Sequence, residues 1–205
     1  MKLTGFLFAA ALLGACTQAA EENYTRHVDP KIGTGGHGHV FVGANVPFGL
    51  VQVGPTSIPQ TWDWCSGYHA SDSTVIGFSH THLSGTGIGD LFDITVMPVV
   101  GEVTYARGEE NDPASGLWSY ADRTREITKP GYYSVPLVRY GIRAELTATA
   151  RVGLHRYTFP ASDAAAVVFD LENGGCWDKA TDTGFRFSDD STRIAGWRCS
   201  TGWAK

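Results

Sequence analysis

The sequence has few charged residues and no cluster of positive charge. Of its 205 residues, 16 are Lys or Arg and 21 are Asp or Glu, so the net charge is −5 and the charged fraction is 18%. Soluble proteins average roughly 25% charged residues. Because no run of Lys and Arg offers a phosphate-binding surface, nucleic acid is not expected as a partner. The 42% of hydrophobic residues excludes intrinsic disorder, which needs low hydrophobicity.

Helical patterns and long apolar runs are missing as well. No segment repeats apolar residues with the 3.6-residue period of a helix, and the 25 glycines indicate many turns. The apolar run from Phe6 to Leu13 is too short to span a bilayer, which takes about 20 residues. Its length is typical of the apolar core of a signal peptide.

The residues that follow this run resemble a bacterial lipobox. In such a motif, here Leu13-Gly14-Ala15-Cys16, a peptidase cuts before the Cys, which then carries acyl chains. This predicts a signal peptide at 1–15, a lipidated tether at 16–24 and a domain at 25–205. The acyl chains on Cys16 would anchor the exported protein to a membrane. The expected location is the bacterial outer membrane or periplasm. An ordinary signal peptide with a nearby cleavage site is the alternative.

Cysteine is scarce beyond this motif. Cys65, Cys176 and Cys199 remain, and an odd number leaves at least one thiol without a partner in the chain. Cys176 and Cys199 are the favoured pair if they face each other across strands. Cys65 is expected to be a buried thiol.

Short segments that alternate apolar and polar residues predict an all-β, antiparallel β-sandwich. Pro136 marks one of them as an edge strand because proline cannot donate a ladder hydrogen bond. The apolar segment 165–171 fits a strand that is buried on both faces. The expected strands are residues 49–55, 93–97, 132–140, 143–152, 155–159, 165–171, 183–187 and 193–198.

The last residues do not look like a natural end of a domain. The chain stops at Gly202-Trp203-Ala204-Lys205, without a turn signal or a polar tail, whereas natural termini are usually polar and frayed. We therefore expect the domain to be truncated at its C-terminal end.

Histidines are concentrated in the first part of the domain. Six of the seven lie between residues 27 and 82: His27, His37, His39, His69, His80 and His82. The glycine-rich segment 33–39 lies among them and lets backbone groups approach a ligand. It is not a P-loop, since no Gly-Lys-Ser/Thr follows it.

The histidines include two His-x-His pairs, at 37–39 and 80–82. On a strand, both members of such a pair point to one side and could hold a transition metal, with Asp90 or Asp93 completing the ligand set. The pairs could equally be hydrogen-bonding groups around a polar cleft. The residues alone leave any metal ligands unidentified.

The segment Trp62-Asp63-Trp64-Cys65-Ser66-Gly67-Tyr68-His69 is dense in aromatic and polar groups. Sugars present apolar C–H faces, which aromatic rings cover, and hydroxyls, which Asp and His side chains bind. Extended backbone would place Trp62 and Trp64 on one face with Asp63 opposite. We expect at least one of the two rings to be exposed, although core packing of both is the alternative.

Signatures of a complete hydrolase are missing. No Gly-x-Ser-x-Gly elbow is present, so an α/β-hydrolase triad is unsupported. Paired carboxylates could hydrolyse a glycosidic bond, but no spacing singles out an acid and a base among Asp63, Asp72, Asp90 and Asp93.

Several long blocks of this chain, taken together, resemble glycoside hydrolase family 92. They occur in the family's order and extend over nearly all of residues 28–205. The blocks are residues 28–39, 43–49, 62–68, 77–87, 130–133 and 145–153.

The resemblance implies an exo-acting α-mannosidase that depends on Ca²⁺ and inverts the anomeric configuration. Its fold would be an N-terminal β-sandwich followed by an (α/α)6 domain, with the active site between the two. The acid, the base and most calcium ligands would come from that C-terminal domain, so no catalytic residue is expected in this chain. Mannose-containing glycans and the protein's own C-terminal domain are the implied partners.

The resemblance also assigns one wall of the sugar cleft to this chain. Trp64 or Trp62 would pack on the sugar beside the scissile bond, near Asp63. Other implied substrate-binding residues are His80, His82, His37 and Gly36.

Two other functions stay open at this point. The chain could belong to a surface glycan-binding lipoprotein without hydrolytic activity. It could also be a metal-dependent hydrolase that uses His37, His39, His80 and His82.

Overall fold

The computed structural model describes residues 22–109, 111–112, 115–174 and 176–203. Within these residues the chain forms twelve strands and three short 3-10 helices, and every strand pairing is antiparallel. The predicted all-β fold is therefore confirmed. No helix in this part of the chain is long and apolar enough to cross a membrane. The predicted signal peptide at 1–15 and the lipidated Cys16 lie outside the described residues.

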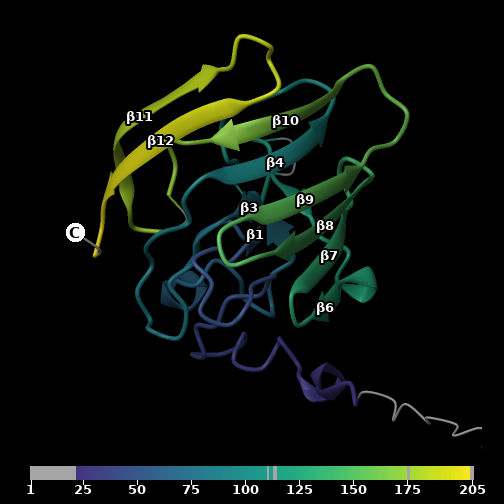
Figure 1. Ribbon diagram of the computed structural model, residues 1–205, viewed down its shortest axis with the longest axis vertical. Helices are drawn as coiled ribbons and strands as arrows, with labels where there is room; N and C mark the ends of the chain where they lie inside the picture. Colours follow the sequence, from purple (N-terminus) through teal and green to yellow (C-terminus); the bar gives the residue numbers. More distant parts are fainter. Residues whose placement is uncertain (1–21, 110, 113–114, 175, 204–205) are drawn as a thin grey trace, which may run out of the picture.

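One four-stranded sheet contains the first long strand of the chain, and its longer strands lie above the loops of the N-terminal part in Figure 1. Its strand order is β1-β3-β4-β10. The predicted segment 49–55 becomes strand only at its end. The strands are β1 (Gly54–Thr56), β3 (Gly77–Ser79), β4 (Thr95–Val100) and β10 (Ala165–Asp170).

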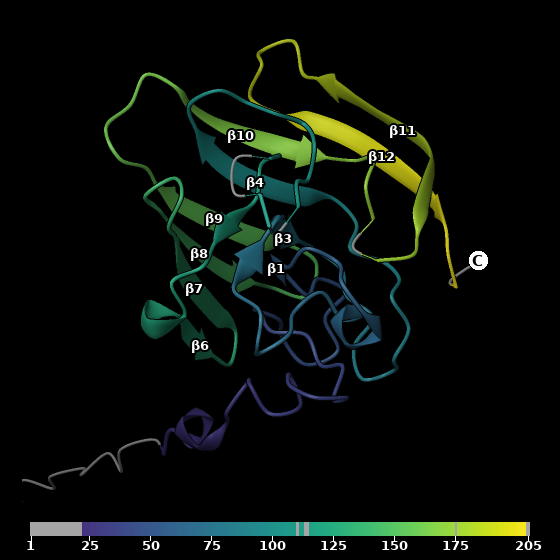
Figure 2. The same cartoon turned by 180° about the vertical axis from the view of Figure 1, so that it is seen from behind.

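A second four-stranded sheet is a simple meander in the order β6-β7-β8-β9 (Figure 2). Along β8, Ile142, Ala144 and Leu146 are buried while Arg143 and Glu145 point to the other face, which is the period-two pattern of a half-buried strand. The strands are β6 (Ile127–Lys129), β7 (Tyr132–Leu137), β8 (Ile142–Ala148) and β9 (Gly153–Thr158).

The core lies between these two sheets and joins them into a sandwich. Phe78 and Met97 of the first sheet belong to the same buried cluster as Tyr133, Leu137 and Leu146 of the second. Burying one large apolar side chain stabilises the fold by roughly 1.5–3 kcal/mol. The shared cluster therefore sets how the loops of the first sheet lie relative to β9.

Pro136 does not mark an edge strand, so that prediction is wrong. β7 lies between β6 and β8, and Pro136 is paired with Arg143 of β8. On the other side, β6 ends its pairing at Ser134, and the Pro136 carbonyl accepts a hydrogen bond from the Asp122 N–H at 2.9 Å. The Pro136 nitrogen, which has no hydrogen to donate, faces the side on which β6 has already ended. The proline therefore removes no hydrogen bond of the sheet.

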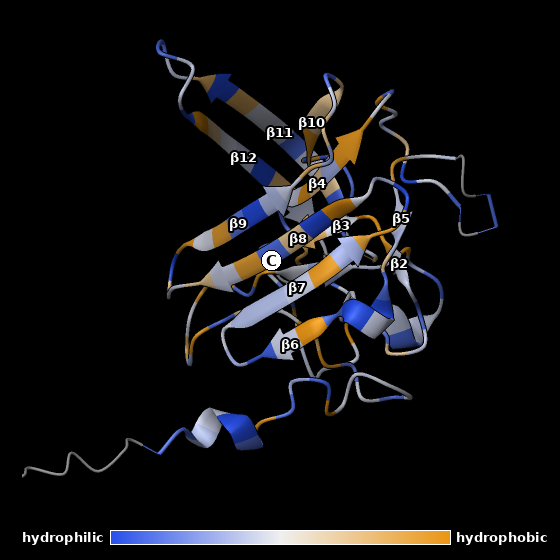
Figure 3. Ribbon diagram, turned by 90° about the vertical axis from the view of Figure 1, so that its right-hand side faces the viewer, coloured by the Kyte–Doolittle hydropathy of each residue, from blue (hydrophilic) through white to orange (hydrophobic). Residues whose placement is uncertain are grey.

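The prediction that 165–171 is buried on both faces is also wrong. β10 alternates between exposed and partly buried residues, and Val167 and Phe169 are 40% and 50% exposed. Figure 3 shows β4, its paired neighbour, coloured mainly as hydrophobic. β10 packs one face on the core through Ala166 and Val168.

A C-terminal hairpin lies beside β10 and β4 at the end of the molecule away from the first 3-10 helix (Figure 1). It pairs β11 (Lys179–Phe187) with β12 (Ile194–Thr201) around the predicted turn at 188–191. Arg198 on β12 ties the hairpin to the rest of the domain through an ion pair with Asp93 at 2.7 Å. It also pairs at 2.5 Å with Asp178, which directly precedes β11. A two-stranded sheet of β2 (Thr74–Val75) and β5 (Ser119–Tyr120) completes the described strands.

Candidate functional site

The glycine-rich segment forms a tight loop in which one glycine is required and a second is favoured. A Cβ on Gly38 would lie 2.0 Å from the Gly33 carbonyl oxygen, which is an impossible contact for any other residue. Gly36 has a φ of +56° in the left-handed region, where L-residues are strained. The loop turns back on itself, and it places the His37 and His39 side chains on the same carboxylate.

That carboxylate is Asp63. His37 donates from Nδ1 to Asp63 Oδ1 at 2.7 Å, and His39 donates from Nε2 to the same oxygen at 3.0 Å. The hydrogen bond from His37, and to a smaller extent the one from His39, lowers the pKa of Asp63 below its usual value. Asp63 therefore stays ionised beside an exposed and a buried imidazole.

Asp63 belongs to a single 3-10 turn, η2 (Trp62–Trp64), and not to the extended segment that we predicted. The prediction that Trp62 and Trp64 share a strand face is therefore wrong. The turn sends the two indoles into different surroundings, and Thr61, the residue before it, is extended. The expectation that at least one ring is exposed is confirmed, because Trp62 is 51% exposed.

Trp62 is held in place without being covered. Its Nε1–H donates to the Gly87 carbonyl at 2.7 Å, and the His39 ring packs edge-on against it with centroids 4.2 Å apart. Gly87 has a φ of +71°, and a Cβ there would lie 2.9 Å from the indole. The fixed, half-exposed indole is an apolar platform beside Asp63 and His37.

Trp64 is more enclosed than Trp62. Its Nε1–H donates to Asp72 Oδ2 at 2.7 Å, and the His69 ring stacks on it at 4.3 Å with an interplanar angle of 21°. His69 Nε2 in turn lies 3.3 Å from the Gly36 carbonyl, to which it donates. Trp64 thus supports the glycine-rich loop through His69, while Trp62 faces outward.

His80 lies in a different cluster, formed with the second sheet. Its Nδ1–H donates to the Ile94 carbonyl at 2.8 Å, and its Nε2 is 3.0 Å from His155 Nε2 on β9. His155 Nδ1 accepts from the Tyr157 hydroxyl at 2.7 Å. Burial lowers the pKa of His80 and brings that of His155 to about 4, so both imidazoles are neutral near pH 7.

His82 is buried between aromatic rings. It is 3% exposed, its Nδ1–H donates to the Gln52 carbonyl at 2.7 Å, and Phe41 and Phe92 pack against its ring, each with centroids 5.2 Å away. Burial lowers its pKa to about 4. Its described contacts are all internal to the protein, and its role in substrate binding stays a prediction.

The two His-x-His pairs do not combine into one metal site, so the four-histidine ligand set is wrong. Among the described residues, the group of three possible ligands that lie together is His37, His39 and Asp63, with ligand atoms within 4.8 Å of one another. His80 points instead to His155, and Asp93 pairs with Arg198. The bend at residue 80 and the separate turn at 37–39 remove the shared strand face on which the expectation depended.

The cysteines also depart from one expectation. Cys65, Cys176 and Cys199 all carry free thiols, so the favoured Cys176–Cys199 pair is wrong. Cys199 lies on β12 opposite Asp182, while Cys176 precedes β11. Cys65 is 1% exposed, as predicted.

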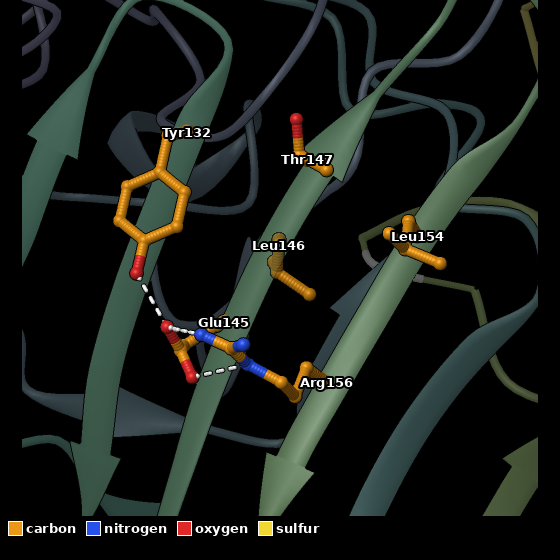
Figure 4. Close-up of a pocket in the computed structure, with 6 residues that line it drawn as sticks. All are labelled: Tyr132, Glu145, Leu146, Thr147, Leu154 and Arg156. Atoms are coloured by element: carbon orange, nitrogen blue, oxygen red, sulfur yellow. Dashed lines mark hydrogen bonds and ion pairs between the residues drawn. The ribbon is translucent and has the colours of Figure 1, made fainter.

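A shallow concavity lies on the outer face of the second sheet, where Glu145 accepts from the Tyr132 hydroxyl at 2.7 Å and pairs with Arg156 at 2.5 and 2.7 Å (Figure 4). These groups satisfy one another. The concavity is lined by Tyr132, Glu145, Leu146, Thr147, Leu154 and Arg156, which include none of the predicted site residues.

Sequence reasoning missed the roles of several residues that build the site. His155 escaped notice because it lies far from the other histidines in the sequence, although it was the one outlier among them. Gly87 carries no distinctive spacing, and Asp72 was considered only as a candidate acid or base, not as the partner of the Trp64 indole. His69 was noted as part of the aromatic segment, but nothing in its spacing indicated that its ring would stack on Trp64.

Comparisons with known proteins agree with this fold. A solved alpha-mannosidase of family GH92 from Bacteroides thetaiotaomicron, in complex with mannoimidazole, is 40% identical and superposes with a TM-score of 0.83 over 87% of this chain and 23% of that one. The GH92 glycosyl hydrolase ccman5 is 30% identical with a TM-score of 0.73, over 88% of this chain and 24% of that one.

A curated protein gives a similar picture. An uncharacterized secreted glycosidase of Arthroderma benhamiae is 28% identical over 168 residues, which are 80% of this chain and 21% of that protein. The chain thus spans about a fifth to a quarter of the length of these relatives. The model of the glycosyl hydrolase family 92 N-terminal domain matches residues 27–205. The chain therefore belongs to glycosyl hydrolase family 92, and these residues are its N-terminal domain.

Proposed function

We propose that this chain is the N-terminal domain of an exported α-mannosidase and forms one wall of its substrate cleft. The enzyme removes terminal α-mannose from glycans with inversion of configuration. The observation that carries the proposal is the Trp62 indole, which is 51% exposed and hydrogen-bonded in place beside the ionised Asp63. The 40% identity to an alpha-mannosidase that binds mannoimidazole supports mannose as the sugar.

The wall has the chemistry that a pyranose requires. The exposed face of Trp62 covers the C–H face of a sugar, while Asp63 accepts hydrogen bonds from hydroxyls at its rim. The exposed His37 ring and the exposed backbone of Gly36 complete the polar edge. His39 and Gly87 hold these groups in position, so little conformational entropy is lost when the sugar binds.

In an inverting hydrolase, a general acid protonates the leaving oxygen while a base activates water on the opposite face. The two carboxyl groups stand about 6.5–9.5 Å apart to admit that water. We assign both to a C-terminal domain outside this chain. The part played by this chain is to bind and orient the sugar and to keep bulk water from its apolar face.

Calcium does not fit the metal-binding group of this wall. Ca²⁺ takes about six to eight oxygen ligands, whereas the cluster found in the described residues offers two imidazole nitrogens and one carboxylate. We therefore place most calcium ligands of the whole enzyme outside this chain. Removal of calcium by a chelator should abolish hydrolysis by the full-length enzyme and leave the fold of this domain intact.

Export and anchoring complete the proposal. The apolar run at 6–13 and the Leu13-Gly14-Ala15-Cys16 motif support a lipoprotein anchored through Cys16. Cys16→Ser should move the protein from the membrane fraction to the soluble fraction of the cell envelope. Unchanged membrane attachment of this variant would contradict the anchor without touching the enzymatic proposal.

The decisive test is hydrolysis of linkage-defined mannobioses by the full-length protein. Trp62→Ala should lower kcat/KM at least ten-fold, because the sugar loses its platform. Trp197→Ala is the matched control: this indole is also 51% exposed and also donates its N–H, here to Asp182 at 2.8 Å. Equal losses in both variants would contradict the assignment of Trp62.

Glycan capture without hydrolysis is the second candidate, because the same platform serves it. The 205-residue chain by itself should bind mannobiose and should not hydrolyse it. Turnover by the pure chain would overturn our placement of the acid and base. Failure of the full-length protein to hydrolyse any mannobiose, with binding retained, would favour the capture function.

A further inference from the structure

The cluster of His37, His39 and Asp63 has the composition of a transition-metal site. Three ligand atoms, His37 Nδ1, His39 Nε2 and an Asp63 carboxylate oxygen, lie within 4.8 Å of one another. Neutral imidazole suits Zn²⁺ and similar ions, while calcium prefers oxygen donors. We propose that these three side chains bind one divalent transition-metal ion, with Zn²⁺ as the reference ion, at the mouth of the cleft.

The distances are close to those that zinc needs. Zn–N and Zn–O bonds of about 2.0–2.2 Å in a tetrahedron separate neighbouring ligand atoms by roughly 3.3–3.5 Å. The two nitrogens are now 2.7 and 3.0 Å from Asp63 Oδ1. An ion between them requires each nitrogen to move a few tenths of an ångström away from Asp63 Oδ1. Once the ion is bound, each imidazole would carry its proton on the ring nitrogen that faces away from it.

The surroundings hold the ligands before an ion arrives. The close approach of Gly38 to Gly33 fixes the turn between the two histidines, and the Val40 N–H donates to the Gly33 carbonyl at 3.2 Å. Trp62 packs edge-on against the His39 ring. Such support of ligand orientation raises metal affinity.

Access and coordination number also fit an ion that arrives from solvent. The His37 side chain is 78% exposed, whereas that of His39 is 6% exposed, so an ion can enter from the His37 side. Three protein ligands leave a fourth tetrahedral position for water or a sugar hydroxyl. The inference concerns metal binding alone and does not depend on hydrolysis of mannosides.

Zinc binding to the full-length, metal-free protein, measured against a chromophoric chelator, tests the proposal. One tight Zn²⁺ should bind per chain, and His37→Ala and Asp63→Asn should each weaken this binding at least ten-fold. His27→Ala is the matched control, since His27 is an exposed histidine outside the cluster, and it should leave the affinity unchanged. A large excess of Ca²⁺ should not displace the zinc.

Cobalt provides a second readout that does not involve activity. Co²⁺ bound by the wild type should give the intense visible bands of a low-coordinate site, and Asp63→Asn should lose them while its circular dichroism stays that of the wild type. The proposal is overturned if zinc binds the Asp63→Asn and His37→Ala variants as tightly as the wild type. Displacement of the zinc by Ca²⁺ would overturn it as well, and the two histidines would then serve as hydrogen-bond donors to Asp63 alone.

Discussion

The imidazoles of His80 and His155 meet through their Nε2 atoms, 3.0 Å apart, and so tie the loop after β3 to β9 in the other sheet. His80 uses its Nδ1 proton on the Ile94 carbonyl, so its Nε2 must accept and that of His155 must donate. Protonation of His80 removes this acceptor. The contact between the sheets at this point therefore requires neutral imidazoles.

This chain should lose stability in mild acid. The pKa of His155 in the folded protein is about 4, against an ordinary value of 6.5, and that of His80 is also lowered. Below pH 6.5 the unfolded chain binds more protons than the folded chain, so the free energy of unfolding falls between pH 6.5 and about 4. His155→Gln should reduce this loss by roughly 1–2 kcal/mol.

Urea unfolding of the chain at pH 7 and pH 5 measures the effect. The interval lies above the usual pKa of carboxyl groups, about 4, so histidines dominate it. His27→Gln, which alters an exposed histidine, should keep the wild-type pH dependence. If His155→Gln loses as much unfolding free energy between pH 7 and pH 5 as the wild type, the His80–His155 pair does not cause the acid sensitivity.

The position of Trp62 should depend on Gly87. Gly85 and Gly87 have similar positive φ values of +75° and +71°, but only at Gly87 would a Cβ contact the indole, at 2.9 Å. Gly87→Ala should therefore weaken mannobiose binding several-fold through displacement of Trp62. Gly85→Ala carries the same backbone strain and should leave the affinity unchanged; titration calorimetry compares the two.

The glycine-rich loop should tolerate a side chain at one glycine and not at another. Gly38→Ala places a Cβ 2.0 Å from a backbone oxygen, whereas nothing lies within 4 Å of a Cβ at Gly36. We expect Gly36→Ala to cost about 1–2 kcal/mol for its left-handed backbone, and Gly38→Ala to cost more. Thermal unfolding checks the order, and a smaller loss in Gly38→Ala would contradict the loop geometry.

Arg198 should be the main anchor of the C-terminal hairpin. Its side chain is 1% exposed and pairs both with the buried Asp178, just before β11, and with Asp93 in the loop before β4. Removing one partner of a buried ion pair costs about 3–5 kcal/mol, so Arg198→Ala should strongly raise hydrogen exchange in β11 and β12.

Arg156→Ala is the control for this experiment. Arg156 also makes two contacts with a carboxylate, that of Glu145, but its side chain is 73% exposed. An exposed pair is worth at most about 1 kcal/mol, so exchange in the hairpin should stay as in the wild type. Similar exchange in both variants would contradict the anchoring role of Arg198.

Much of the fold followed from local patterns. The alternation in 143–152 predicted β8, and the polar spacer at 188–191 predicted the turn of the last hairpin. The wrong predictions concern neighbours. A proline can sit in an inner strand such as β7 when the neighbouring strand, here β6, ends before it. The apolar residues of β10 did not reveal that its second face would stay exposed, because that depends on distant parts of the chain.

The sequence by itself determined that this chain is an antiparallel β protein with histidines and tryptophans concentrated in one segment, because side-chain alternation and glycine turns act over a few residues. The tertiary structure alone decided which of those residues meet. The turn at Gly33–Gly38 and the 3-10 turn at Trp62–Trp64 bring His37 and His39 into contact with Asp63. Packing of the two sheets brings His80 into contact with His155. These contacts join residues separated by 24 to 75 positions, and a shared core, not local spacing, sets such distances.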